Sequence, residues 1–228
     1  MEQEKNVLRW GGLAGMLGGV LFILAMVVVV AGPVGMEDPA DLEGWLTRFP
    51  DIQMASVVEN VVYLVALLLE VPLFLTLHRA LRKTSLAPAL FGSALGILGI
   101  VSMVVSTTPH VAHAPLFEIY NAPGATPADQ ATIAILWQAV RGLFDAMLYV
   151  GFFIVPSGLI LIGVAMLGTP TFGKGVGGVV VALGGIGFVA AVFQMIDPAS
   201  MVGMGSYFAI IISCFVMGWK VYSLSKVS

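Results

Sequence analysis

Ionisable and polar side chains interrupt two apolar stretches of this sequence, at 52–77 and 139–167. In chain order they are Glu59, Asn60, Glu70, Arg141 and Asp145. A charged group inside a membrane-spanning segment is costly, so it marks a partner or a function. Carboxylates with an arginine nearby can form an ion pair, hold a cationic or polar ligand, or exchange a proton.

At about 100° per residue, the polar groups of each stretch fall on one helical face. The first face carries Glu59, Tyr63 and Glu70, and the second carries Gln138, Arg141, Asp145 and Tyr149. We predict that Glu59, Arg141 and Asp145 cluster in the outer leaflet. Together with Asn60, Tyr63 and Tyr149 they would line a ligand-binding pocket between the two helices. The alternative is a structural ion-pair network that clamps these helices at the membrane surface.

Glu70 is expected deeper in the membrane than this cluster, with no cationic residue at its own depth. Two interpretations are open for it. It is a proton-relay carboxylate, or it is a protonated glutamic acid that is hydrogen-bonded to a neighbouring backbone group.

A second group of residues, which could bind a metal ion, follows the apolar stretch at 87–106. It consists of His110, His113 and Glu118. Two histidines on one helical turn and a carboxylate can supply three protein ligands to a divalent metal and leave one position open, as catalytic zinc requires. The alternative is that these are solvated loop residues near the membrane interface. The sequence contains no HExxH or GxSxG motif that would strengthen an enzymatic interpretation.

Composition indicates which elements must position these residues. Of 228 residues, 59% are hydrophobic and 10% are charged, whereas soluble domains have about 25% charged residues. Six apolar stretches are long enough to cross a hydrocarbon core of about 30 Å. We therefore predict an all-α membrane protein, a six-transmembrane-helix bundle that forms a single transmembrane domain over 1–228. The predicted helices are 10–32, 52–77, 87–106, 139–167, 176–196 and 204–222.

The basic residues predict the orientation of this bundle. Eight of the ten lie in segments that six crossings place on a single side: Lys5, Arg9, Arg79, Arg82, Lys83, Lys174, Lys220 and Lys226. Arg141 lies within a predicted spanning helix, and only Arg48 lies in an opposite loop. Because short cytoplasmic loops are enriched in lysine and arginine, both termini are predicted to be cytoplasmic. The first apolar stretch is too long for a cleaved secretory signal, so we interpret it as a spanning helix. No basic stripe with interleaved aromatics is present, so a nucleic-acid partner is not expected.

The outer loops contain helix-start signals. Asp38-Pro39, Thr126-Pro127 and Asp197-Pro198 each place a capping oxygen before a proline, and proline is well suited to the first helical position. After the first signal, Leu42, Trp45, Leu46 and Phe49 recur at helical spacing. This pattern predicts a short interfacial helix at 39–49 that lies flat on the outer membrane surface, with Trp45 at headgroup level.

Small residues mark the predicted packing surfaces. Glycines recur every four residues at Gly11, Gly15 and Gly19, and again at Gly92 and Gly96. Such spacing lets helix backbones approach closely. The glycines serve as seams within the bundle or, alternatively, join two copies in a homo-oligomer. Tyr63 with Pro72, and Tyr149 with Pro156, suggest a repeated helical hairpin. The single cysteine, Cys214, is interpreted as a packing residue.

Two segments carry a resemblance to a known family. They are Arg9-Trp10-Gly11-Gly12-Leu13-Ala14-Gly15 and the stretch from Tyr63 to Leu81, which ends Pro72-Leu73-Phe74-Leu75-Thr76-Leu77-His78-Arg79-Ala80-Leu81. With the glycine-rich helix that follows, they resemble an uncharacterised family of bacterial multi-pass integral-membrane proteins, domain of unknown function 4386. The resemblance implies a bacterial or archaeal cell membrane and assigns no catalytic residue.

These observations lead to three hypotheses about function. The leading one is that the protein, embedded in the lipid bilayer, binds, transports or senses a small cationic or polar ligand at the outer-leaflet pocket. The second is a metal-dependent membrane enzyme that uses His110 and His113 with a divalent metal. The third is a structural or accessory membrane protein without a small ligand.

Overall fold

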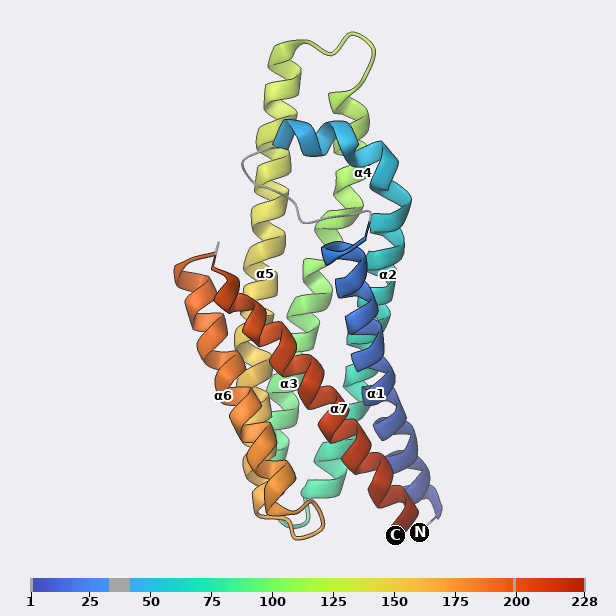
Figure 1. The fold of residues 1–228 in the computed structure, drawn as a ribbon, viewed down its shortest axis with the longest axis vertical. Helices are drawn as coiled ribbons and strands as arrows, with labels where there is room; N and C mark the ends of the chain where they lie inside the picture. The colour runs from blue at the N-terminus through green and yellow to red at the C-terminus, as the bar shows by residue number, and fades with distance from the viewer. Residues whose placement is uncertain (1, 33–41, 199, 228) are drawn as a thin grey trace.

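The computed structural model describes residues 2–32, 42–198 and 200–227 (Figure 1). This part of the chain is almost entirely helical and contains no β-strand. Six of its helical segments are long and apolar enough to cross a membrane, with α3 and α4 counted as one. The prediction of an all-α protein with six such helices is thereby confirmed. The α-helices are α1 (Glu2–Val30), α2 (Leu42–Leu81), α3 (Leu86–Ser106), α4 (Thr108–Tyr120), α5 (Pro127–Leu167), α6 (Lys174–Ile196) and α7 (Met204–Val227).

The helices differ greatly in length. α2 has 40 residues and α5 has 41, which at 1.5 Å per residue is about 60 Å, or twice the hydrocarbon thickness. α6 and α7 have 23 and 24 residues. At the end away from the termini, α2, α4 and α5 therefore continue past α6 and α7 (Figure 1). We call this projecting part, formed by 42–55, 108–120 and 127–140, the outer cap, because the predicted orientation places it on the outer side.

The start of α2 differs from the predicted interfacial helix. Residues 33–41, with the Asp38-Pro39 signal, lie outside the described residues. From Leu42 the segment is already the first part of α2, and it crosses over α4 and α5 before the chain turns along the bundle (Figure 1). Pro50 lies within this helix.

The apolar face of this segment is covered by protein. Trp45, Leu46 and Phe49 are buried against Trp137 of α5 and against α4. Trp45 thus packs against protein, because α4 and α5 offer an apolar surface that covers this face. Its predicted depth at headgroup level stays a prediction.

α4 forms in a segment where the sequence pattern predicts a loop. Its prolines and histidines interrupt the apolar periodicity, yet a proline in the first turn costs no hydrogen bond because the N–H there has no helical partner.

The helix-start signals have different outcomes. The first turn of α5 has the predicted cap: the Asp129 amide donates to the Thr126 hydroxyl at 3.2 Å, and the Thr126 amide donates to the Asp129 carboxylate at 2.9 Å. Asp197 instead closes α6, because its amide donates to the Phe193 carbonyl at 2.9 Å. The next helix begins only after the 3-10 turn Met201–Gly203.

Glycines are the contact points between the helix backbones. A Cβ atom at Gly158 of α5 would lie 2.7 Å from the Gly92 carbonyl oxygen and from the Gly96 nitrogen of α3. Similar close approaches join Gly163 of α5 to Gly177 of α6. Within the described chain, the glycines at Gly11, Gly15, Gly92 and Gly96 thus face other helices of the same molecule. Association of two copies stays a prediction.

The seam between α3 and α5 can be tested with a minimal substitution. Gly158→Ala is expected to lower the free energy of unfolding by about 1–3 kcal/mol, because the new methyl group meets backbone atoms that cannot move aside. The measurement is denaturant unfolding in detergent micelles. Gly178→Ala is the matched control, since nothing lies within 4 Å of a Cβ there, and it should leave stability unchanged or raise it by up to about 1 kcal/mol. Equal effects of both substitutions would contradict the close packing of α3 against α5 at Gly158.

Candidate functional site

The predicted ion pair between Arg141 and Asp145 forms within α5. The Arg141 Nε atom lies 3.3 Å from one Asp145 carboxylate oxygen and 3.4 Å from the other. The two side chains are 33% and 31% exposed. The guanidinium also lies over the ring of Phe144, 5.6 Å from its centre. This is a partly solvated pair one helical turn apart.

Glu59 has different neighbours. It is partly buried on α2 and lies within electrostatic reach of Tyr63, one turn later, and of Tyr207 on α7. In the described chain no ion pair joins it to Arg141 or Asp145. The structure therefore brings Arg141 and Asp145 together and holds Glu59 with two tyrosines instead.

Four aromatic residues from four helices meet beside Glu59. They are Phe22 of α1, Tyr63 of α2, Phe152 of α5 and Tyr207 of α7, and we call them the aromatic group. Phe22 meets Tyr63 edge-on at 5.6 Å and Tyr207 edge-on at 5.8 Å between ring centres. Phe152 meets Tyr207 at 6.1 Å. Such edge-to-face pairs are favourable and fix the ring orientations.

The two tyrosine hydroxyls of this group differ in their hydrogen bonding. Tyr207 donates to the carbonyl oxygen of Phe22 at 3.2 Å. The buried Tyr63 hydroxyl has no hydrogen-bond partner among the described residues. A carboxylate, a tyrosine hydroxyl with spare capacity and aromatic rings together provide the groups that recognise a cation or an amine.

Sequence reasoning missed Phe22, Phe152 and Tyr207. Tyr207 follows the start of α7 by less than one turn, which places it at the depth of Glu59 in a bundle of parallel and antiparallel helices. Matching residues by depth could have found it. Nothing in the sequence indicates that α7, rather than α5, is the neighbour of α2 at this level.

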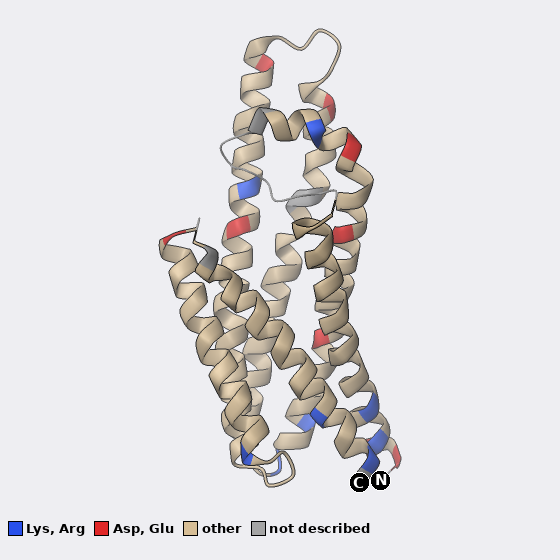
Figure 2. Cartoon of the chain, viewed as in Figure 1, with Lys and Arg blue, Asp and Glu red and all other residues tan. Residues whose placement is uncertain are grey.

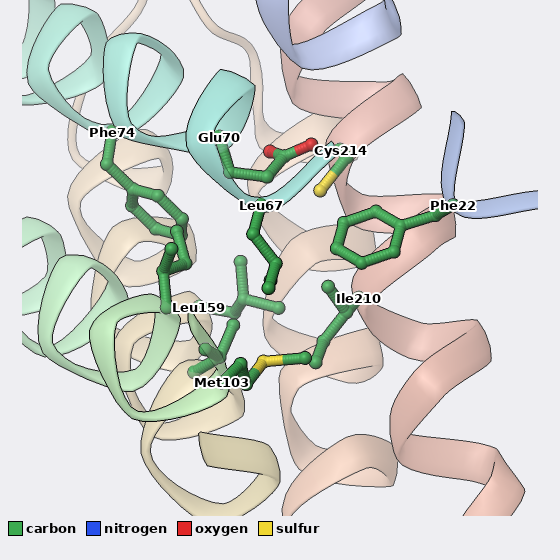
Figure 3. A pocket seen from close by; sticks show the side chains of 10 residues that line it. Phe22, Leu67, Glu70, Phe74, Met103, Leu159, Ile210 and Cys214 are labelled. Carbon is green, nitrogen blue, oxygen red and sulfur yellow. The ribbon is translucent and has the colours of Figure 1, made fainter. Parts of the chain in front are cut away.

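Of the remaining predicted polar residues, one lies near the Arg141 and Asp145 ion pair and the others lie elsewhere. Tyr149, one turn after Asp145, lies within reach of that carboxylate and beside Gln194 of α6. Gln138 is exposed and Asn60 is partly buried. Glu70 lies about 16 Å further along α2 than Glu59, at 1.5 Å per residue, and is enclosed by protein (Figure 3).

The predicted metal ligands lie in different environments. His113 of α4 is buried in the outer cap and stacks on Trp137, with ring centres 4.0 Å apart. Glu118 is exposed, and the His110 side chain lies outside the described residues. Among the residues that the structure describes, no three His, Cys, Asp or Glu side chains are grouped to hold a metal ion. The observed contacts of His113 are those of a packing residue.

Comparisons with family models, with curated proteins and with solved structures found no match to this chain. The resemblance to the bacterial membrane family therefore stays a prediction.

The Arg141 and Asp145 pair should contribute little to stability because it is partly solvated. Asp145→Asn is expected to lower the free energy of unfolding by about 0.5 kcal/mol or less, measured by denaturant unfolding in micelles. Trp137→Ala sets the scale in the same assay: this side chain is fully buried, and its loss should cost about 3–5 kcal/mol. A cost of several kcal/mol for Asp145→Asn would show that the pair clamps the structure.

Proposed function

We propose that the protein binds a small cationic or polar ligand, which reaches it from the outer side, at Glu59 and the aromatic group. The observation that carries this proposal is the position of Glu59. Its carboxylate is partly buried beside two tyrosines, and no described lysine or arginine pairs with it. A carboxylate that is partly withdrawn from water and lacks a counter-charge favours a cationic partner.

The aromatic group supports a choice within the cations. Ammonium groups are attracted to the faces of tyrosine and phenylalanine rings, and aromatic cages that bind substituted ammonium ions use the same combination of rings and carboxylate. The free capacity of the Tyr63 hydroxyl provides an additional acceptor for an N–H donor. We therefore place an organic amine ahead of a metal cation as the ligand class.

Bends in the two longest helices support the proposal that the protein transports or senses such a ligand. α2 contains Pro72 and α5 contains Pro156, and each proline removes one helical hydrogen bond, which favours a bend at that point. Ligand bound at the outer end of α2 can act on the inner end through this bend. The similar placement of tyrosine and proline in α2 and α5 also underlies the proposal of a repeated helical hairpin.

We further propose that the end holding both termini faces the cytoplasm of a bacterial or archaeal cell. Most lysines and arginines lie at that end, and most carboxylates lie toward the other end (Figure 2). This distribution agrees with the enrichment of basic residues in cytoplasmic loops. The outer cap and Glu59 then face the outside of the cell membrane.

Cysteine labelling tests this orientation. Ala122→Cys lies in the exposed turn after α4, and Thr171→Cys lies in the exposed turn before α6. A membrane-impermeant maleimide should label Ala122→Cys in intact cells and Thr171→Cys only after lysis. The natural Cys214 is buried and serves as the unlabelled background. The reverse pattern would invert the topology.

Ligand binding is tested with tetramethylammonium as the probe. Added to purified protein in detergent, it should raise the melting temperature of the wild type and leave Glu59→Gln unchanged. At a hundredfold excess over Kd, binding to the folded state alone stabilises by about 2.7 kcal/mol. The measurement is thermal unfolding followed by the fluorescence of the native tryptophans.

Two controls make this result specific. tert-Butanol, an uncharged molecule of similar shape, should not stabilise the wild type. Asp145→Asn should respond to tetramethylammonium as the wild type does, because its carboxylate is already paired with Arg141. If Glu59→Gln is stabilised as much as the wild type, the ligand site does not include Glu59.

A further inference from the structure

Glu70 is the most deeply enclosed carboxyl group among the described residues. Its side chain is 1% exposed. It lies about 14 Å along α2 from the level of Arg79 at the basic end, which is close to half of a hydrocarbon core of about 30 Å. Figure 3 shows its carboxyl group pointing toward the thiol of Cys214 on α7.

The surroundings of this carboxyl group contain no counter-charge. No hydrogen bond of standard geometry reaches either of its oxygen atoms from the described residues, and the polar group that lies against it is the Cys214 thiol. The groups that face it are Phe22 of α1, Met103 of α3, Leu159 of α5, and Ile210 and Cys214 of α7. Of these only the Cys214 thiol can titrate or take part in a hydrogen bond. A bare carboxylate is unstable in such surroundings, so the group must bind a proton or another cation.

The space around the carboxyl group is small and shaped for it. The cavity that it lines has a volume of about 10 Å³ open to the centre of a water molecule, which is room for one water at most. On α1, a Cβ at Gly18 would collide with a carboxyl oxygen of Glu70, so this glycine makes room for the side chain. A hydrated metal ion does not fit, whereas a proton does.

We propose that Glu70 is a proton-binding site at the middle of the membrane, with the Cys214 thiol as its hydrogen-bond partner. The carboxylate takes up one proton to become the carboxylic acid and releases it again, with no change of oxidation state. In the acid form the Glu70 O–H donates to the Cys214 sulfur, and in the ionised form the thiol donates to the carboxylate. This site stands on its own geometry and does not require the ligand site at Glu59.

The structure also connects the two carboxyl groups. Glu59 and Glu70 lie on the same face of α2, because eleven residues at 100° each bring the helix back to within about 20°. Phe22 touches both places: it packs edge-on against Tyr63 and Tyr207 and also lines the Glu70 cavity. A proton that enters from the outer side would pass this ring.

Infrared spectroscopy of the protein in lipid nanodiscs tests the proton site directly. A protonated carboxylic acid has a carbonyl stretching band apart from the amide bands, and a thiol has an S–H stretching band in an otherwise empty region. Because Cys214 is the single cysteine of the chain, its S–H band needs no assignment. Both bands are followed from about pH 5 to about pH 10, a range that spans the ordinary behaviour of carboxyl and thiol groups.

The expected result is a coupled change. As the pH rises, the acid band decreases, and the S–H band moves to lower wavenumber with the same midpoint because the thiol begins to donate to a carboxylate. In Glu70→Gln the part of the acid band that changes together with the S–H band is absent, and the S–H band does not move. In Cys214→Ala the acid band remains but its midpoint changes. Glu59→Gln, the matched control, loses only the acid absorption of Glu59 itself and keeps the S–H shift with its wild-type midpoint, so a failure of the ligand site is distinguished from a failure of the proton site.

Two outcomes would overturn the proposal. An acid band and an S–H band that stay constant over the whole range would show that Glu70 is a permanently protonated packing residue. An S–H band that moves with pH equally in Glu70→Gln would assign the change to another group. The wild-type titration decides the first point even if Glu70→Gln does not fold.

Discussion

The close approach of α5 to α3 and α6 is the contact on which the rest of the structure depends. Lipid is as apolar as the side chains that face it, so helices in a membrane associate through tight packing rather than through hydrophobic burial. Gly158 and Gly163 provide this packing, since backbone atoms of the neighbouring helices occupy the places where side chains would be. The same contacts fix the position of α5, whose outer half brings Trp137 into the outer cap.

The outer cap shows how a change of solvent along one helix changes what its residues can do. In the proposed topology Glu59, Arg141 and Asp145 lie toward the outer side of the membrane, where charge is less costly than at its centre. Arg141 and Asp145 satisfy each other within α5. Glu59 faces tyrosines from two helices, so the same region holds one neutralised pair and one carboxylate that is open to a partner.

Two glutamates on one face of α2 thus acquire different chemistry from their surroundings. Glu59 is partly exposed beside tyrosines, and Glu70 is enclosed by apolar side chains and one thiol. Environment rather than residue type assigns such roles, as in enzymes whose paired carboxyl groups serve as acid and base. Phe22, which contacts both surroundings, is the side chain through which the state of one can affect the other.

The sequence by itself determined the membrane class, the six apolar helices and the cap at Thr126. These depend on local composition, on spacing along one helix or on contacts three residues apart, all of which are readable in one dimension. Only the tertiary structure decided that Glu59 lies beside Tyr207 rather than Arg141, that Trp45 packs on Trp137 rather than on lipid, and that Cys214 faces Glu70. Helical spacing tells which residues share a face, but it does not tell which helix covers that face. That choice is made by the glycine contacts, where the order of the helices around the bundle is set by how closely their backbones can approach.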